Sequence, residues 1–196
     1  RRGDLLESIS KKCAEFGGTA RVFAGDVTDA AAVNDAVSKF RDEFGKIDIL
    51  IANAGIGGSR HSKDLVVDDV RRVMEVNFMG SVNSVAAVLP KMIERGAGHL
   101  VAISSLAGFR GLPRSASYSA SKGAMTNFFE SVRLDTAELG IDVTIIQPGF
   151  IKTPLTSGRE NKMPFLMELD DAIPYFINAI ERMKRFSAFP WQLASF

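Results

Sequence analysis

Tyr118 and Lys122 lie four positions apart in the segment ASYSASKG, residues 116–123. Residues four apart share one face of a helix. The ammonium of Lys122 would therefore favour the phenolate of Tyr118 and lower its pKa, which is about 10 in free tyrosine. The first turn of a helix, where backbone dipoles favour an anion, has the same effect. Such a pair could transfer protons near neutral pH; the alternative is an ordinary tyrosine beside an exposed lysine.

Ser105 stands thirteen residues before Tyr118, at the end of the apolar segment HLVAISS. A strand end and the following helix start lie on the same rim of a parallel sheet, so both hydroxyls could reach one carbonyl oxygen. The serine would polarise that oxygen while the tyrosine transfers the proton. The small residues around Tyr118 would leave room for a flat substrate and a cofactor. Alternatively, Ser105 only caps a turn.

The elements that must position these residues alternate along the chain. Apolar spacing predicts helices over 4–16, 29–45, 67–95, 116–139 and 170–185, and strands over 19–26, 47–55, 98–105 and 141–149. Strands that are apolar on both faces indicate a parallel sheet covered by helices on both sides. The predicted fold class is α/β, a doubly wound, Rossmann-like sheet that forms a single domain over 1–196. Ligands of such folds bind beyond the carboxyl ends of the strands, which here end in small or polar residues.

Composition excludes several other classes. The chain has 196 residues, of which 46% are hydrophobic and 24% charged, and its net charge is +1. That balance gives no indication of nucleic-acid binding. The single cysteine, Cys13, excludes an internal disulfide, and the two histidines leave little from which to build a zinc site or a hydrolase triad. No membrane span is visible, so we expect a cytoplasmic protein.

Four motifs in a fixed order resemble the short-chain dehydrogenase/reductase family: NAG (53–55), SS (104–105), YSASK (118–122) and PGFIKT (148–153). The resemblance implies an oxidoreductase that moves a hydride between NADP(H), or NAD(H), and a carbonyl or secondary alcohol. It implies that Tyr118 is the general acid/base and that Lys122 lowers its pKa and binds the nicotinamide ribose. Ser105 would orient the substrate. Asn77, in VNFMG, would support a water-mediated proton relay, or it could simply face solvent.

The same resemblance implies cofactor contacts at the strand ends. Asp26 and Val27 would contact the adenine, although Asp26 could merely begin a turn before Asp29, the next helix cap. The NAG segment would line the adenosine side, and the backbone of Ile151 and hydroxyl of Thr153 would meet the carboxamide. The complete set of implied positions after these strands is Asp26, Val27, Asn53, Ala54, Gly55, Pro148, Gly149, Ile151 and Thr153.

The glycine-rich turn T-G-x-x-x-G-x-G, which seats the cofactor pyrophosphate in this family, does not occur in the 196 residues. GIGGS (55–59) follows a strand but opens no helix, and we interpret it as a substrate-side loop. We therefore expect the first βαβ unit to be missing, either because the chain is a fragment or because the sequence omits it. The strand at 19–26 would then lack its neighbour, and the chain alone should not fold stably. Arg1 and Arg2 would follow the missing second strand, where a basic residue favours the 2′-phosphate of NADP; they could also bind nothing.

Residues 155–172 occupy the position of a substrate lid in the family. Their apolar cluster, 163–167, indicates a hydrophobic substrate or simple packing onto the sheet. Surplus apolar residues on the helices at 80–95 and 116–139 are expected at the contacts of a homodimer or homotetramer. The basic and aromatic residues of 181–196 could continue into a membrane-peripheral helix, which is a minor alternative. Rival functions are a non-catalytic relative that binds a cofactor or partner, an inactive truncated product, and an epimerase or dehydratase, which would usually have a larger C-terminal domain.

Overall fold

The protein is built on a four-stranded parallel sheet. The computed structural model describes residues 3–157 and 162–194, and its strands lie in the order β1 (Ile49–Ala52), β2 (Gly98–Ile103), β3 (Ile141–Pro148) and β4 (Phe186–Phe189). All three strand pairings are parallel, with Ala52 opposite Ala102 and Ile103 opposite Ile146. The carboxyl ends of the strands therefore meet at one edge, as the predicted α/β fold requires.

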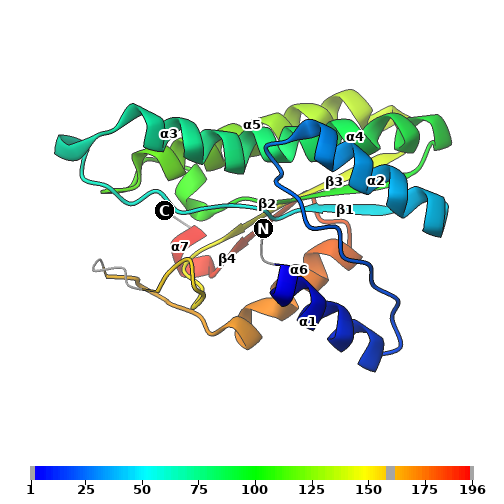
Figure 1. Cartoon of the computed structure of the whole chain (residues 1–196). Coiled ribbons are helices and arrows are strands. Elements are labelled where there is room, and N and C mark those ends of the chain that lie inside the picture. The colour runs from blue at the N-terminus through cyan, green and yellow to red at the C-terminus, as the bar shows by residue number, and fades with distance from the viewer. Residues whose placement is uncertain (1–2, 158–161, 195–196) are drawn as a thin grey trace.

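Helices cover both faces of the sheet (Figure 1). One face carries α2 (Ala30–Phe44), α3 (Val67–Met74), α4 (Gly80–Arg95) and α5 (Ala116–Thr136), and the other carries α1 (Gly3–Glu15) and α6 (Leu169–Glu181). Each face has its own apolar cluster, one around Leu100 and Phe129 and one around Val101 and Phe189. Alternate residues of β2 enter opposite clusters, which confirms a single doubly covered, Rossmann-like domain.

The helix predicted over 67–95 is continuous but contains an irregular turn. Residues Glu75–Met79 form a π-helical turn between α3 and α4. A π turn widens the helix by one residue and often marks a functional position. Asp29 is the N-cap of α2, as predicted, because its carboxylate accepts hydrogen bonds from the N–H groups of Ala31 and Ala32.

One predicted strand is absent, and one observed strand was not predicted. Residues 19–26 run without strand pairing, since no strand in the described part of the chain lies beside them. The segment 186–189, which sequence analysis did not assign, is the strand β4 and is followed by α7 (Trp191–Ala194). β4 packs because Phe189 is buried against the ring of Phe176. A membrane-peripheral helix that continues from this segment stays a prediction.

The free edge of the sheet exposes apolar side chains. Ile49 and Ile51 of β1 are each about half exposed, at 48% and 49%. Leu5 and Ile9 of α1 are also exposed, and no residue of α1 is buried. Apolar surface of this kind indicates elements that lack part of their packing surface. None of the described helices is long and apolar enough to cross a membrane.

Candidate active site

Tyr118 and Lys122 share one face of α5, close to its start. Tyr118 lies in the first turn of the helix and is half-buried, whereas Lys122 is 4% exposed. The Nζ atom of Lys122 lies 5.9 Å from the centre of the Tyr118 ring. The alternative of an ordinary exposed lysine is therefore wrong, and a cation lies within electrostatic range of the phenol.

Burial determines the charge state of Lys122. Removal from water disfavours the ammonium and lowers the pKa of Lys122 to about 8. Its Nζ donates a hydrogen bond of 2.7 Å to the backbone oxygen of Ile103, at the end of β2. Nζ also lies 3.8 Å from Sδ of Met125. Because an ammonium has three donors, these two contacts leave one for a ligand hydroxyl.

Asn77 is fully buried inside the π turn, so the alternative of a solvent-facing side chain is wrong. Its Oδ1 accepts from the N–H of Ile56 at 2.7 Å, and its Nδ2 donates to the oxygen of Ile56 at 3.0 Å. The paired bonds fasten α3 and α4 to the segment that follows the NAG motif.

Ser121 is a site residue that sequence analysis missed. Its hydroxyl donates to the backbone oxygen of Tyr118 at 2.8 Å and accepts from Nδ2 of Asn77 at 3.0 Å. One buried serine therefore connects the asparagine to the turn of helix that carries the tyrosine. The run of small residues around Tyr118 could have pointed to Ser121. Its small side chain makes this internal contact, however, whereas the small residues were predicted to leave room for ligands.

Ser105 lies directly after β2, where the chain turns toward α5. Its hydroxyl accepts from the N–H of Ala107 at 3.1 Å and contacts the oxygen of Pro148 at 3.4 Å. It therefore caps a short helical turn, as its alternative role required, at the same rim of the sheet as Lys122. Both the capping geometry and the predicted position at the strand end hold.

A close approach between two glycines fixes this turn against α5. A Cβ atom on Gly108 would lie 3.0 Å from the carbonyl carbon and oxygen of Lys122, and one on Gly123 would lie 3.2 Å from the oxygen of Gly108. The neighbouring Ser104 adds a hydrogen bond of 3.1 Å from its hydroxyl to the oxygen of Lys122. These contacts hold the Ser105 turn in register with the helix of Tyr118 and Lys122.

The NAG segment leaves β1 at the same edge. Asn53, Ala54 and Gly55 are all exposed. A Cβ atom on Gly55 would lie 3.4 Å from Oδ1 of Asn77 and 3.7 Å from Nζ of Lys122. The glycine therefore lies beside the buried polar pair, as an exposed backbone surface over it.

The PGFIKT segment leaves β3 next to this surface. The N–H of Gly149, after Pro148, donates to the oxygen of Phe189, which ties the segment to β4. Ile151 is 9% exposed and forms an isolated bridge with Met167. The Thr153 hydroxyl lies 3.4 Å from the oxygen of Ile151 and is half-buried.

Asp26 forms the turn that its alternative role predicted. Its carboxylate accepts from the N–H and hydroxyl of Thr28, and its backbone oxygen accepts from the N–H of Asp29. Val27 is half-buried, and its oxygen accepts from Nδ2 of Asn83 at 2.9 Å. A ligand contact at either position remains a prediction, while Arg1 and Arg2 lie outside the described residues.

The segment expected to form a lid is divided between packing and exposure. Met167 packs against the apolar cluster that contains Ile151, while Phe165 and Leu166 are 51% and 42% exposed. Residues 158–161 within it lie outside the described part of the chain, and its last residues already belong to α6. Packing onto the sheet therefore describes Met167, while a lid that closes over a hydrophobic substrate stays a prediction. The described residues hold no group of three or more His, Cys, Asp or Glu that could bind a metal ion.

Comparison with known proteins decides the family. Residues 1–164 match the short chain dehydrogenase family. The chain belongs to the short-chain dehydrogenase/reductase family. The predicted resemblance and enzyme class, an NAD(P)-dependent oxidoreductase, are therefore confirmed.

This chain is similar to proteins from bacteria and animals. It is 42% identical to an uncharacterized oxidoreductase of Myxococcus xanthus, covering 99% of this chain and 77% of that protein. It is 41% identical to dehydrogenase/reductase SDR family member 7B of Mus musculus, covering 80% of this chain and 50% of that protein, so it spans only half the length of this relative.

Solved structures show the same fold. A gluconate 5-dehydrogenase from Burkholderia cenocepacia, in complex with NADP and tartrate, has a TM-score of 0.86 at 26% identity and covers 96% of this chain and 81% of its own. An NAD+-bound xylitol dehydrogenase has a TM-score of 0.74 at 36% identity, over 76% of this chain and 58% of its own. These relatives support a nicotinamide cofactor and a small-molecule substrate, but they differ in which cofactor they bind.

Proposed function

We propose that this protein catalyses reversible hydride transfer between NADP(H) and a carbonyl or secondary alcohol, with Tyr118 as general acid/base. The observation that carries the proposal is the buried ammonium of Lys122, 5.9 Å from the Tyr118 ring on the same helix face. A buried charge without an acidic partner is costly and is retained where it serves chemistry. The rival hypothesis, a non-catalytic relative, does not explain why the protein would retain the free-energy cost of burying this ammonium.

The chain's own residues have separate roles in the proposed reaction. Tyr118 gives its phenolic proton to the substrate oxygen during reduction and takes it back during oxidation. Lys122 stabilises the resulting phenolate by its positive charge. Ser105 donates a hydrogen bond to the same substrate oxygen, for which its hydroxyl would leave its contact with Pro148.

Proton resupply involves the buried network behind the tyrosine. Asn77, Ile56 and Lys122 border the surface at Gly55, where a water held by the Ile56 oxygen could pass a proton toward Lys122. The pKa of Lys122, lowered to about 8, places it in a suitable range for exchanging protons near neutral pH.

The residues at the strand ends fit the nicotinamide half of the cofactor. Lys122 keeps a donor for a ribose hydroxyl beside its contacts with Ile103 and Met125, and the side-chain-free surface at Gly55 allows close approach. Ile151 and Thr153, after β3, would hold the carboxamide, and Asp26 and Val27 the adenine. The cofactor, when bound, supplies or accepts the hydride. Arg1 and Arg2 make NADP the preferred form.

A hydrophobic substrate is part of the proposal. Phe165 and Leu166 present exposed apolar surface in the segment 155–172, which we propose closes over the substrate. Exposed apolar residues on the helices α4 and α5, among them Ile93 and Leu134, support a homodimer or homotetramer. A cytoplasmic location also remains part of this proposal.

Replacement of the two tyrosines tests the catalytic assignment. Tyr118→Phe should reduce kcat for NADPH oxidation with a panel of hydrophobic ketones by at least about 100-fold, the usual contribution of general acid–base catalysis. Tyr175→Phe is the matched control, because Tyr175 is the only other tyrosine; it lies in α6 and stacks on Phe189 of β4. Equal activity of the Tyr118→Phe variant and the wild type would overturn the assignment.

Cofactor titration tests the choice between NADP and NAD. Quenching of protein fluorescence should give a lower Kd for NADP than for NAD, and replacement of Arg1 and Arg2 by Gln should reduce that difference. Tighter binding of NAD would overturn the NADP assignment without affecting the role of Tyr118.

A further inference from the structure

A chain of buried polar side chains connects three of the elements that carry the proposed site. Its members are Ser104, which follows β2, Thr126 of α5 and Gln147 of β3, and all three are buried. Nε2 of Gln147 donates to Oγ1 of Thr126 at 3.3 Å, and this oxygen lies 2.8 Å from Oγ of Ser104. The Ser104 hydroxyl donates to the backbone oxygen of Lys122 at 3.1 Å. Hydrogen bonds therefore run without a break from β3 through α5 to the end of β2.

Each member of this network stands next to a different part of the proposed site. Ser104 directly precedes Ser105, and Gln147 directly precedes the PGFIKT segment. Thr126 follows Lys122 by one helical turn of α5. The network therefore joins the serine, the helix of the tyrosine and lysine, and the segment that would hold the carboxamide.

Stability does not explain why the core contains these polar groups. Oε1 of Gln147 is buried and makes no hydrogen bond with any residue that the structure describes. A buried network with an unsatisfied member is less favourable than apolar packing of the same shape, and the neighbouring Met125 and Ile145 show that the core here is otherwise apolar. Hydrogen bonds add a defined distance and direction, which apolar contacts do not.

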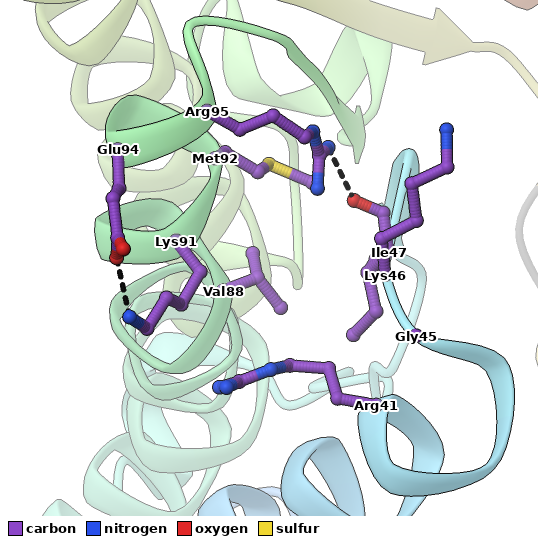
Figure 2. A pocket seen from close by; sticks show the side chains of 9 residues that line it. All are labelled: Arg41, Gly45, Lys46, Ile47, Val88, Lys91, Met92, Glu94 and Arg95. Atoms are coloured by element: carbon purple, nitrogen blue, oxygen red, sulfur yellow. Dashed lines mark hydrogen bonds and ion pairs between the residues drawn. The ribbon is translucent and has the colours of Figure 1, made fainter.

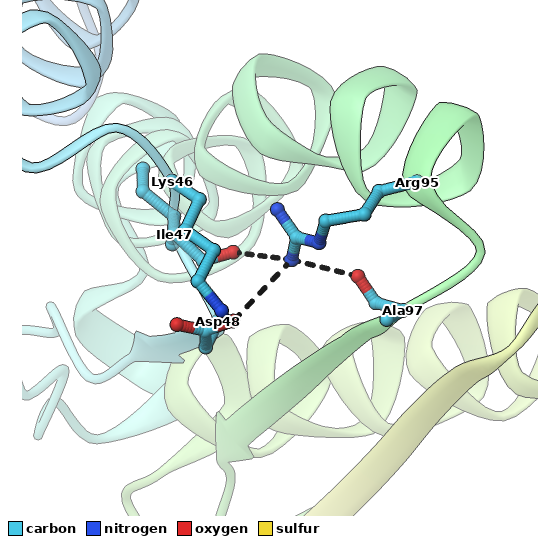
Figure 3. Close-up of polar contacts among 5 residues, drawn as sticks. All are labelled: Lys46, Ile47, Asp48, Arg95 and Ala97. Carbon is cyan, nitrogen blue, oxygen red and sulfur yellow. Dashed lines mark hydrogen bonds and ion pairs between the residues drawn. The ribbon is translucent and has the colours of Figure 1, made fainter.

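A junction at the other edge of the sheet provides a contrast. Nη2 of Arg95 donates to the backbone oxygens of Ile47 and Ala97, which fastens α4 to the residues that lead into β1 and β2 (Figure 3). The pocket beside this junction has Val88 and Met92 in its lining, but both are already buried in the core, so it gives no indication of a ligand (Figure 2). The amino ends of parallel strands lie at the edge opposite the proposed site, so this junction serves packing alone.

We propose that Thr126 and Gln147 are positioning residues for hydride transfer, an inference that rests on the proposed function. Acting through Ser104, they fix the place of Ser105 and of α5 relative to the PGFIKT segment. Transfer of a hydride and a proton requires aligned groups, and a displacement of about 1 Å can cost about 100-fold in rate. The network therefore supports kcat without touching substrate or cofactor.

Removal of one hydroxyl group tests the proposal. Thr126→Val keeps the side-chain shape but breaks the network at its centre. The kcat for ketone reduction should therefore fall at least about tenfold, while KM for NADPH stays within about twofold of the wild-type value. Thr126→Ser restores the hydroxyl and should keep kcat within about twofold of wild type. Gln147→Met breaks the same network, so the double variant with Thr126→Val should lose about as much as the more impaired single variant.

Two further variants separate positioning from general stability. Thr136→Val removes another buried hydroxyl of α5, which donates to the oxygen of Val132 at 2.7 Å, and Arg95→Gln weakens the junction at the other edge. Both should lower the midpoint of urea unfolding but leave kcat within about twofold of wild type. An unchanged kcat in Thr126→Val, or an equal loss of kcat in Thr136→Val, would overturn the positioning role.

Hydrogen exchange tests the network without any turnover. The N–H of Ala107 bonds to Oγ of Ser105 at 3.1 Å, in the turn that the network holds. Its exchange should be at least about tenfold faster in Thr126→Val than in the wild type or Thr136→Val. Equal exchange rates in the three proteins would contradict the proposal, whatever happens to ketone reduction. Full activity of Tyr118→Phe would instead refute the proposed function, and the exchange rates would still decide whether Thr126 fixes the turn.

Discussion

Replacing Lys122 by methionine should change how protein stability depends on pH. Burial lowers the pKa of Lys122 from 10.5 to about 8, so the folded state releases its proton more readily than the unfolded state. The fall of 2.5 units, at 1.36 kcal/mol per unit, corresponds to about 3 kcal/mol of destabilisation at neutral pH. Methionine has a similar length and carries no charge, so it removes this penalty.

The direction of the effect follows from proton binding. Between about pH 8 and 10.5 the unfolded state holds more protons on Lys122 than the folded state, so wild-type stability rises with pH in this range. Below that range the full penalty applies. The variant also loses the hydrogen bond from Nζ to Ile103, worth about 1.5–3 kcal/mol, and this loss offsets much of the gain at neutral pH.

The measurement is urea unfolding followed by circular dichroism at several pH values. The free energy of unfolding of Lys122→Met minus that of the wild type should fall by about 3 kcal/mol as pH rises from 7 to 10.5. Lys39→Met, which removes an exposed lysine of α2, should show no comparable change. A difference for Lys122→Met that is constant across this pH range would refute the argument that the ammonium is desolvated.

Three further predictions concern the packing and the buried polar groups. Gly108→Ala should destabilise the protein by about 1–3 kcal/mol in urea unfolding and reduce kcat, because the new methyl group meets the Lys122 backbone. In the control Gly111→Ala the methyl group meets nothing within 4 Å, so stability and kcat should both stay unchanged. Ser121→Ala should cost about 1–2 kcal/mol in the same assay, since it leaves the Tyr118 oxygen without its hydroxyl donor; an unchanged midpoint would contradict this. Burial lowers the pKa of His99, so its neutral form stabilises the fold above about pH 6.5 and this contribution is lost as pH falls through the lowered pKa. Wild-type stability should therefore fall more steeply from about pH 7 to 5 than that of His99→Gln, and parallel pH profiles would rule out this role for His99.

Local patterns were sufficient for most of the elements. The helix after Asp29 could be predicted because its cap and its apolar spacing are local properties, and the structure has both. The apolar strands that became β1, β2 and β3 could be predicted for the same reason. Residues 19–26 have the composition of a strand, but a strand also needs a hydrogen-bonded neighbour. The absence of the glycine-rich turn already led us to expect that this neighbour is missing, and the segment is unpaired in the described part of the chain.

The short strand β4 was missed because its four residues carry too weak a pattern. Phe186–Phe189 is shorter than a typical strand and follows a basic segment that obscured it. It is stabilised by pairing with β3 and by burial of Phe189, both of which are long-range contacts. The sequence could not show either contact.

The sequence by itself determined the chemistry available to this protein. The spacing of Tyr118 and Lys122 on one helix, and the order of the motifs after each strand, depend only on local periodicity and led to the family. Tertiary structure decided the environment of those groups. It buried Lys122 and lowered its pKa, fixed Asn77 in a π turn, and joined it to Tyr118 through Ser121. These properties depend on desolvation and on contacts between residues far apart in the chain, which is why only the folded structure shows them.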